Sequence, residues 1–128
     1  MKLLHIDSSV LGDNSVSRVL SAQVVAAIRS TTPEVQVSYR DLADASPAHF
    51  SLQALAEPGQ LADEARGNAE ATGTLLDEFL ASDVLVIAAS MYNFSVPTQL
   101  KAWVDRIAQA GKTFRYTANG AEGLAGGK

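Results

Sequence analysis

The side chains best suited to bind a charged ligand in this chain lie near its N-terminus. Four serines and an asparagine follow a short apolar run and lead directly into a helical pattern: Ser8, Ser9, Asn14, Ser15 and Ser17. Free backbone N–H groups and the helix dipole at such a helix start attract a phosphate, and serine hydroxyls add donors without adding charge. The same residue types are also ordinary helix caps, so this segment alone fits a phosphate site and a simple cap equally well.

A second segment holds large apolar side chains where a polar loop is expected. Residues 90–97 have the sequence Ser-Met-Tyr-Asn-Phe-Ser-Val-Pro and follow a continuous apolar run. A flat aromatic ligand would stack on Tyr92 or Phe94 while Asn93 contacted its polar edge. Alternatively, Met91 and Phe94 cap the hydrophobic core, and the loop by itself slightly favours this second interpretation.

Three predicted strands must position these loops. Leu3–Ile6 is a short apolar run, and Val84–Ala89 is continuous and uncharged, as in a strand covered on both faces. Val35–Arg40 alternates apolar and polar residues, which is typical of a strand at a sheet edge. Because helical patterns alternate with these strands, the sequence predicts an α/β fold with a parallel sheet.

The predicted helices follow the strands. The first begins at Ser15 and ends before Pro33, and its apolar stripe is typical of a helix packed on a sheet: Val16, Val19, Leu20, Val24, Ala27 and Ile28. The second spans Leu61–Ala81, with Asn68 facing water and a buried end formed by Leu75, Leu76, Phe79 and Leu80. The third begins near Pro97 and ends by Gly111, with an apolar face of Leu100, Trp103, Val104, Ile107 and Ala108. We expect residues 41–60 to be mainly loop.

The positions of the two unusual loops favour a common ligand. In a doubly wound sheet of order 2-1-3-4-5, ligands bind at the carboxyl ends of strands one and three, where the order reverses. The serine segment follows strand one and the aromatic segment follows strand three, so both would border one crevice. A phosphate cradle beside an aromatic, amide-bearing loop suits flavin mononucleotide (FMN).

Composition excludes several classes of function. The 128 residues contain no cysteine and only two histidines, which excludes thiolate chemistry and favours a metal-free protein. The formal net charge is −4 without a basic patch, so we expect no nucleic-acid partner. The apolar N-terminal run is broken by His5 and Asp7, and no run spans a bilayer. We therefore expect a cytoplasmic protein, with residues 1–128 forming one domain and no membrane contact.

The aromatic segment and the residues after it resemble a known family. Residues 91–97 are followed by Leu-Lys-Ala-Trp-Val-Asp-Arg-Ile at 100–107, and this motif is similar to that of the FMN-dependent NADH-azoreductases. The matching segments run along essentially the whole chain: 8–9, 15–17, 91–97, 100–107, 114–117 and 120–128. Some members carry the label acyl-carrier-protein phosphodiesterase, which the lack of a metal-ligand cluster does not support.

The resemblance implies a flavodoxin-like fold and a homodimer with FMN at its interface. It also implies two-electron transfer from NADH or NADPH to quinones and azo compounds. The residues that it assigns to the phosphate end of the flavin are Ser9, Ser15, Val16 and Ser17. Those that it assigns to the isoalloxazine ring are Met91, Tyr92, Asn93 and Phe94, with Tyr116 nearby. The flavin would carry the chemistry, so no side chain is predicted to be an obligatory acid or base.

Family members continue through a fourth and a fifth strand. This chain ends where strand four should begin, so we expect a fragment with strand order 2-1-3, in which strand three forms an unprotected edge. Two alternatives to a reductase stay open. The chain could bind a flavin without turnover, or act as a nucleotide-binding scaffold that works through partner contacts.

Overall fold

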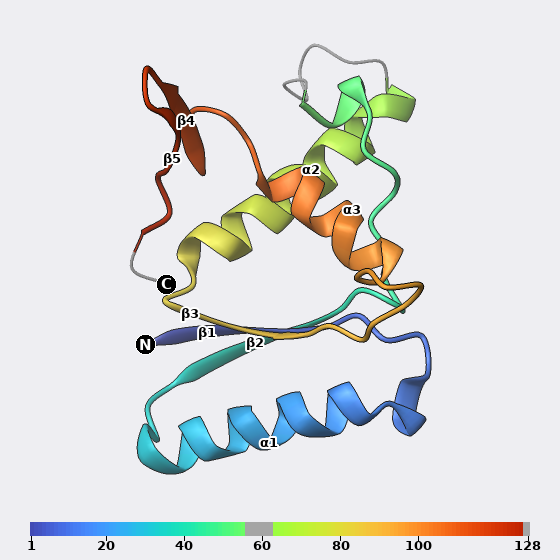
Figure 1. The fold of residues 1–128 in the computed structure, drawn as a ribbon, viewed down its shortest axis with the longest axis vertical. Helices are drawn as coiled ribbons and strands as arrows, with labels where there is room; N and C mark the ends of the chain where they lie inside the picture. Colours follow the sequence, from blue (N-terminus) through green and yellow to red (C-terminus); the bar gives the residue numbers. More distant parts are fainter. Residues whose placement is uncertain (56–62, 127–128) are drawn as a thin grey trace. The chain divides into compact units, whose positions relative to one another are not determined.

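The computed structural model describes residues 1–55 and 63–126. Three strands, β1 (Lys2–Asp7), β2 (Gln36–Asp41) and β3 (Val84–Ala88), form a parallel sheet of order β2-β1-β3 (Figure 1). The predicted order is therefore confirmed, with β1 in the centre. Asp7 pairs with Asp41 on one side and with Ala88 on the other, so the carboxyl ends of all three strands are level.

The central strand is the most deeply buried part of the sheet. Leu3, Leu4 and Ile6 are at most 2% exposed. The prediction that β3 is covered on both faces is wrong, because Ile87 is 41% exposed and Val84–Val86 are only half-buried. Within the described residues β3 has β1 as its one neighbouring strand, which leaves its outer edge open.

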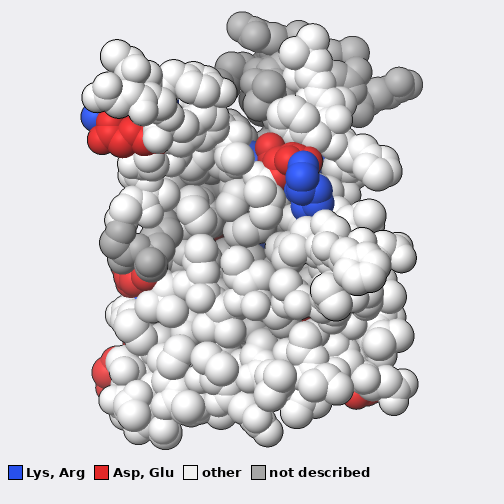
Figure 2. All heavy atoms as spheres, viewed as in Figure 1, with Lys and Arg blue, Asp and Glu red and all other residues white. Residues whose placement is uncertain are grey.

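Helix α1 (Val16–Thr31) packs on the sheet through a face that hydrophobicity did not predict. Its buried residues are Ser21 and Val25, and Val25 joins Leu3 and Val35 in the core. Most of the predicted stripe faces solvent, with exposures of 48–73% at Val24, Val19, Leu20 and Val16. The Ser21 hydroxyl donates to Asp7 Oδ1 at 2.8 Å, and this polar contact orients the helix. The exposed side of α1 is consequently apolar, and few charged groups lie over it in Figure 2.

The chain divides into two compact units. The first comprises residues 1–46 and 82–101, and it contains the parallel sheet, α1 and a short 3-10 helix, η1 (Gly12–Asn14). The second comprises residues 47–81 and 102–127, and it contains the 3-10 helix η2 (Leu52–Leu55) and α2 (Asp63–Ala81). Helix α3 (Thr98–Ile107) begins in the first unit and ends in the second. The single-domain assignment stays a prediction.

The second unit also contains a hairpin that the sequence analysis did not predict. Strands β4 (Phe114–Thr117) and β5 (Gly120–Gly123) pair antiparallel around a turn next to the Asn119-Gly120 dipeptide. The sequence predicts a turn at this dipeptide, and what it did not predict is the pairing of the two flanking strands. Residues 56–62 of the predicted loop and second helix, and residues 127–128 of the matched C-terminal segment, lie outside the described residues.

Several burial predictions for the helices are confirmed and others are wrong. Leu75, Leu76, Leu100, Trp103 and Ile107 are buried as expected, whereas three residues are exposed: Leu80, Val104 and Ala108. Asn68 does not simply face water, because its Oδ1 accepts a 2.7 Å hydrogen bond from the Arg106 guanidinium. Among the described residues, no helix combines the length and the apolar character that a membrane span requires.

Candidate functional site

The loop after β1 is anchored to the end of β3 by a buried serine. Ser8 and Ser9 are completely buried. The Ser8 hydroxyl donates to the Ala88 carbonyl oxygen at 2.7 Å, which joins two carboxyl strand ends directly. The loop therefore starts from a fixed position at the edge of the sheet where ligands bind in doubly wound folds.

A row of hydroxyl groups runs from the start of α1 to the loop after β3. Ser15 caps α1 by accepting a hydrogen bond from the Arg18 N–H, so the helix-cap interpretation holds for this residue. Ser15 Oγ lies 3.0 Å from Ser17 Oγ, which lies 2.9 Å from Ser90 Oγ. Ser90 belongs to this row although the sequence analysis did not assign it to the site. The Val16 side chain is 73% exposed, so a role for Val16 at an anion would come from its backbone N–H at the helix start.

Tyr92 brings the aromatic loop into contact with the serine loop. Its hydroxyl lies 3.1 Å from Ser9 Oγ and accepts a 3.2 Å hydrogen bond from the Val10 N–H. The hydrogen bond with Ser9, and to a smaller extent that with Val10, lowers the pKa of Tyr92 because both stabilise the phenolate. The structure thus brings together the ends of the two loops that the sequence analysis singled out.

Residues 92–95 form a tight two-residue turn. Tyr92 N donates to Ser95 O at 2.8 Å, and Ser95 N donates to Tyr92 O at 3.0 Å. Both central residues have positive φ, 50° at Asn93 and 60° at Phe94. Such angles are common for asparagine but are unusual for a bulky residue such as phenylalanine.

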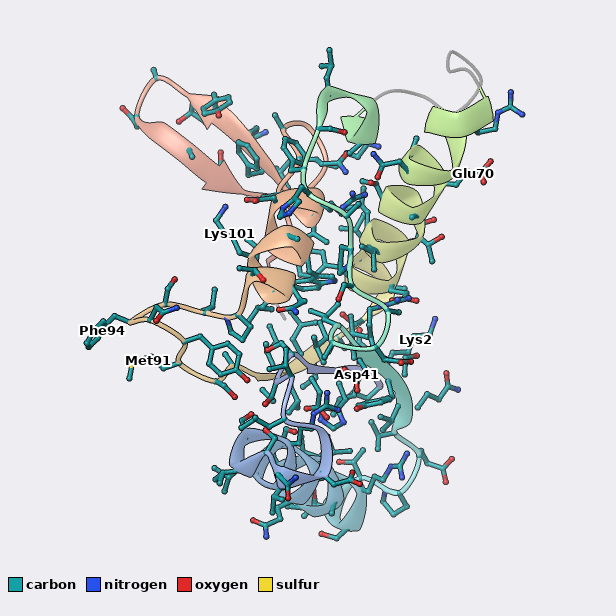
Figure 3. All side chains as sticks on the ribbon, turned by 90° about the vertical axis from the view of Figure 1, so that its right-hand side faces the viewer. Lys2, Asp41, Glu70, Met91, Phe94 and Lys101 are labelled. Carbon is teal, nitrogen blue, oxygen red and sulfur yellow. The ribbon has the colours of Figure 1, made fainter. Side chains whose placement is uncertain are left out.

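The turn presents its apolar side chains to solvent. Phe94 is 96% exposed and Met91 is 74% exposed, and both project outward from the loop after β3 (Figure 3). The alternative interpretation, in which these two residues cap the core, is therefore wrong. A strained turn that holds a phenylalanine in water is the kind of backbone feature that concentrates at ligand sites.

A groove in the first unit runs beside this turn. Its volume is about 440 Å³, and it is lined by residues from the serine loop, the aromatic loop and the start of α3, among them Val10, Tyr92, Asn93, Val96, Gln99 and Lys101. Tyr92 and Asn93 were predicted site residues, whereas Gln99 and Lys101 were not. Their position in the first turns of the helix that follows the aromatic loop is the signal that could have identified them.

A network of charged groups lies at the same ends of β1 and β2. Arg18 pairs with Asp41 through both terminal nitrogens of its guanidinium, one at 2.8 Å from Oδ1. This pairing lowers the pKa of Asp41 and raises that of Arg18. Burial, together with the hydrogen bond that Tyr39 donates to Asp7, raises the pKa of Tyr39 to about 12. The sequence analysis missed Arg18 and Asp41, since neither belongs to a recognised motif.

Tyr116, the last predicted site residue, lies on β4 in the second unit. It is 77% exposed and packs edge-to-face on Phe114, with the ring centroids 5.3 Å apart. Its assignment to a flavin stays a prediction. In the described part of the chain no cluster of histidine and carboxylate side chains could hold a metal ion.

Comparisons with known proteins agree with this fold. Two curated relatives are an FMN-dependent NADH:quinone oxidoreductase 3 of Pseudomonas fluorescens, 56% identical over 132 residues, and an FMN-dependent NADH:quinone oxidoreductase 1 of Pseudomonas putida, 58% identical over 132 residues. Both alignments cover the whole chain, and the chain spans 65% of the length of each relative.

Two solved structures have similar folds. A Bacillus anthracis FMN-dependent NADH-azoreductase in complex with FMN has a TM-score of 0.84 at 25% identity, covering 97% of this chain and 63% of that one. A second Bacillus anthracis azoreductase has a TM-score of 0.86 at 24% identity, covering 100% and 65%. The model of a family described as "Flavodoxin-like fold" matches residues 1–128. With the β2-β1-β3 parallel sheet, this match over the full chain shows that the chain belongs to the flavodoxin-like fold family.

Proposed function

We propose that this chain binds FMN and belongs to an NAD(P)H-dependent oxidoreductase that reduces quinones and azo compounds. The observation that carries the proposal is the Tyr92–Ser9 contact of 3.1 Å, which joins the serine loop after β1 to the exposed aromatic turn. FMN has one part suited to each loop: its charged phosphate fits the hydroxyl groups, and its flat ring fits the aromatic turn. The names of the relatives and of the azoreductase structure that contains FMN support this assignment.

The residues at the start of α1 fit the phosphate end. Ser9, Ser15 and Ser17 provide hydroxyl groups, and the first N–H groups of α1, including that of Val16, have no partner within the helix. Hydrogen bonds to a charged phosphate are about twice as strong as neutral ones. The hydroxyl row from Ser15 to Ser90 would then turn its donors toward the anion, because hydroxyl hydrogens rotate freely.

The residues of the aromatic turn fit the ring end. Met91 and Phe94 offer exposed apolar surface, and Asn93 offers an amide for the polar edge of the ring. Holding Phe94 at a φ of 60° costs on the order of 1 kcal/mol, which a stacked ring would offset by covering its exposed face. Tyr116 is proposed as a further aromatic contact.

FMN, when bound, would supply the two-electron chemistry between a nicotinamide donor and a quinone or azo acceptor. The residues of the chain would hold the ring in the groove and exclude water from one of its faces. Donor and acceptor would occupy this groove in turn, so we expect ping-pong kinetics. We also propose a cytoplasmic homodimer, and the exposed Met91 and Phe94 support it as surface that a second copy would cover.

The flavin content of the purified protein tests the proposal. We expect a yellow protein, or uptake of added FMN by the colourless form, together with oxidation of NADH when a quinone is present. A protein that stays colourless after incubation with FMN would contradict the proposal and favour a nucleotide-binding scaffold. A yellow protein that does not oxidise NADH would identify a flavin-binding module without turnover.

A further inference from the structure

Arg18 lies where a helix does not favour a cation. It is the third residue of α1, close to the positive end of the helix dipole, where a positive charge is unfavourable. Despite this, only 16% of its side chain is exposed, so the guanidinium is largely buried and does not extend into water. The contacts of the guanidinium explain this position.

The guanidinium holds the Ser9 carbonyl with two of its N–H groups. Nη2 donates to the Ser9 oxygen at 2.8 Å, and Nε donates to the same oxygen at 3.3 Å. The opposite side of the guanidinium pairs with both carboxylate oxygens of Asp41 at the end of β2. Arg18 therefore links the backbone of the serine loop at Ser9 to the end of β2 at Asp41.

All five N–H donors of Arg18 have partners within the protein. Nε is occupied by Ser9, Nη2 by Ser9 and Asp41, and Nη1 by Asp41 and the Tyr39 hydroxyl, which lies 3.2 Å away. A guanidinium has no further donors. Arg18 is therefore built to hold protein groups in place and not to contact a phosphate directly.

The charge of Arg18 also matters for an anion at this position. Asp7 is 4% exposed, and its Oδ2 lies 3.7 Å from Arg18 Nη1, so two carboxylates surround one guanidinium. The other titratable groups that face Asp7 are Tyr39, which donates to it, and His5, whose Nε2 lies 3.3 Å from Oδ1. One guanidinium offsets one of the two carboxylate charges, so removing Arg18 would leave both charges to repel an incoming phosphate.

We propose that Arg18 is a positioning residue for phosphate recognition: it orients Ser9 through its carbonyl and offsets one of the two negative charges of Asp7 and Asp41. This inference rests on the proposed FMN function. The effect of Arg18 should depend on the phosphate of the ligand, because the ring contacts are made by other residues.

Binding of FMN and of riboflavin, which lacks the phosphate, tests this role. Titrations followed by flavin fluorescence give both dissociation constants. We expect Arg18→Gln to weaken FMN binding about tenfold or more and to leave riboflavin binding within about threefold of wild type. Arg18→Lys keeps the positive charge but loses the planar guanidinium and its paired hydrogen bonds. Its FMN affinity should therefore fall relative to its riboflavin affinity, but by less than in Arg18→Gln.

The matched control is Arg29→Gln. Arg29 lies in the last turn of α1 and is exposed, so its removal changes the net charge equally without touching the serine loop. We expect the FMN-to-riboflavin preference of this variant to equal that of wild type.

Three outcomes would overturn the inference. The first is that Arg18→Gln loses affinity for FMN and for riboflavin equally. The second is that Arg18→Gln binds FMN as tightly as wild type. The third is that Arg29→Gln loses affinity for FMN but not for riboflavin. If Arg18→Gln precipitates, Arg18→Lys decides, and a wild-type preference in that variant would also overturn it. A wild-type protein that binds neither flavin would instead refute the proposed function, and this inference with it.

Discussion

The Tyr92 hydroxyl lies 3.1 Å from Ser9 Oγ across 83 residues of sequence. Tyr92 also lines the groove, and the contact exists because β1 and β3 are parallel neighbours whose carboxyl ends are level. The loops that follow the two strands therefore begin next to each other at the carboxyl-terminal edge of the sheet.

FMN should be the preferred flavin, and FAD should not. The proposed phosphate site lies at one helix start, and no second fingerprint for an adenylate is present in the sequence. Heat denaturation of the native protein followed by chromatography of the released flavin would identify it. Release of FAD would contradict this prediction.

Ser17→Ala should weaken FMN binding and leave the fold intact. Ser17 Oγ bridges Ser15 Oγ and Ser90 Oγ, and a hydrogen bond to a charged phosphate is worth about 1.5–3 kcal/mol. The control is Ser30→Ala, because the Ser30 hydroxyl only donates to Ala27 O at the far end of α1. FMN titration measures the effect, and far-UV circular dichroism checks folding. An unchanged dissociation constant would reduce Ser17 to a structural role.

Phe94→Gly should stabilise the protein while weakening flavin binding. Glycine adopts the φ of 60° without the steric cost that phenylalanine carries there, so the free energy of unfolding should rise by about 0.5–1 kcal/mol. The exposed ring is lost at the same time. Phe94→Ala removes the ring but keeps the strained φ, so it should weaken binding without stabilising. Urea denaturation and FMN titration separate the two effects, and a glycine variant that binds FMN as tightly as wild type would exclude a role for the ring.

Asn68→Ala should destabilise the second unit. Asn68 Oδ1 accepts from Arg106 Nη2 at 2.7 Å, and Arg106 is 1% exposed. Arg106 is surrounded by neutral acceptors, namely Ala48 O, Asn68 and Thr72 Oγ1, so burial lowers its pKa. Removing one acceptor from a buried guanidinium should cost about 2 kcal/mol in a urea denaturation experiment. Thr74→Ala, on the exposed face of α2, is the control, and equal stabilities of the two variants would contradict this role of Asn68.

Asp41→Asn should flatten the acid limb of the stability profile. Arg18 lowers the pKa of Asp41 in the folded state, so this pair stabilises the fold above the pKa of the unfolded chain, about 3.9. The stabilisation is lost as the pH falls through the lower folded pKa. Urea midpoints measured from pH 7 down to pH 3 should therefore decline less in the variant than in wild type. Asp77→Asn, an exposed carboxylate on α2, should keep the wild-type slope, and a wild-type slope in Asp41→Asn would contradict the pairing.

Local sequence patterns predicted the three strands and the two loops of the candidate site, whereas the order 2-1-3 came from the doubly wound fold that their alternation suggested. Short apolar runs at Leu3–Ile6 and Val84–Ala89 predicted the strands, because the residues that stabilise a strand are neighbours in sequence. The alternation of strands and helices then constrained the sheet to parallel, and the serine and aromatic segments followed its carboxyl ends. For the same reason Ser15 was recognisable as a helix cap from the residues beside it.

Tertiary structure alone decided which face of α1 is buried and which residues support the site. Hydrophobicity favoured Val16 and Leu20 for the buried face, yet the hydrogen bond from Ser21 to Asp7 turns another face inward. Arg18 and Asp41 are 23 residues apart and carry no motif, so their pairing became evident only in the folded chain. Such contacts are not encoded by periodicity, because a buried polar group selects its partner by distance and orientation in the folded state.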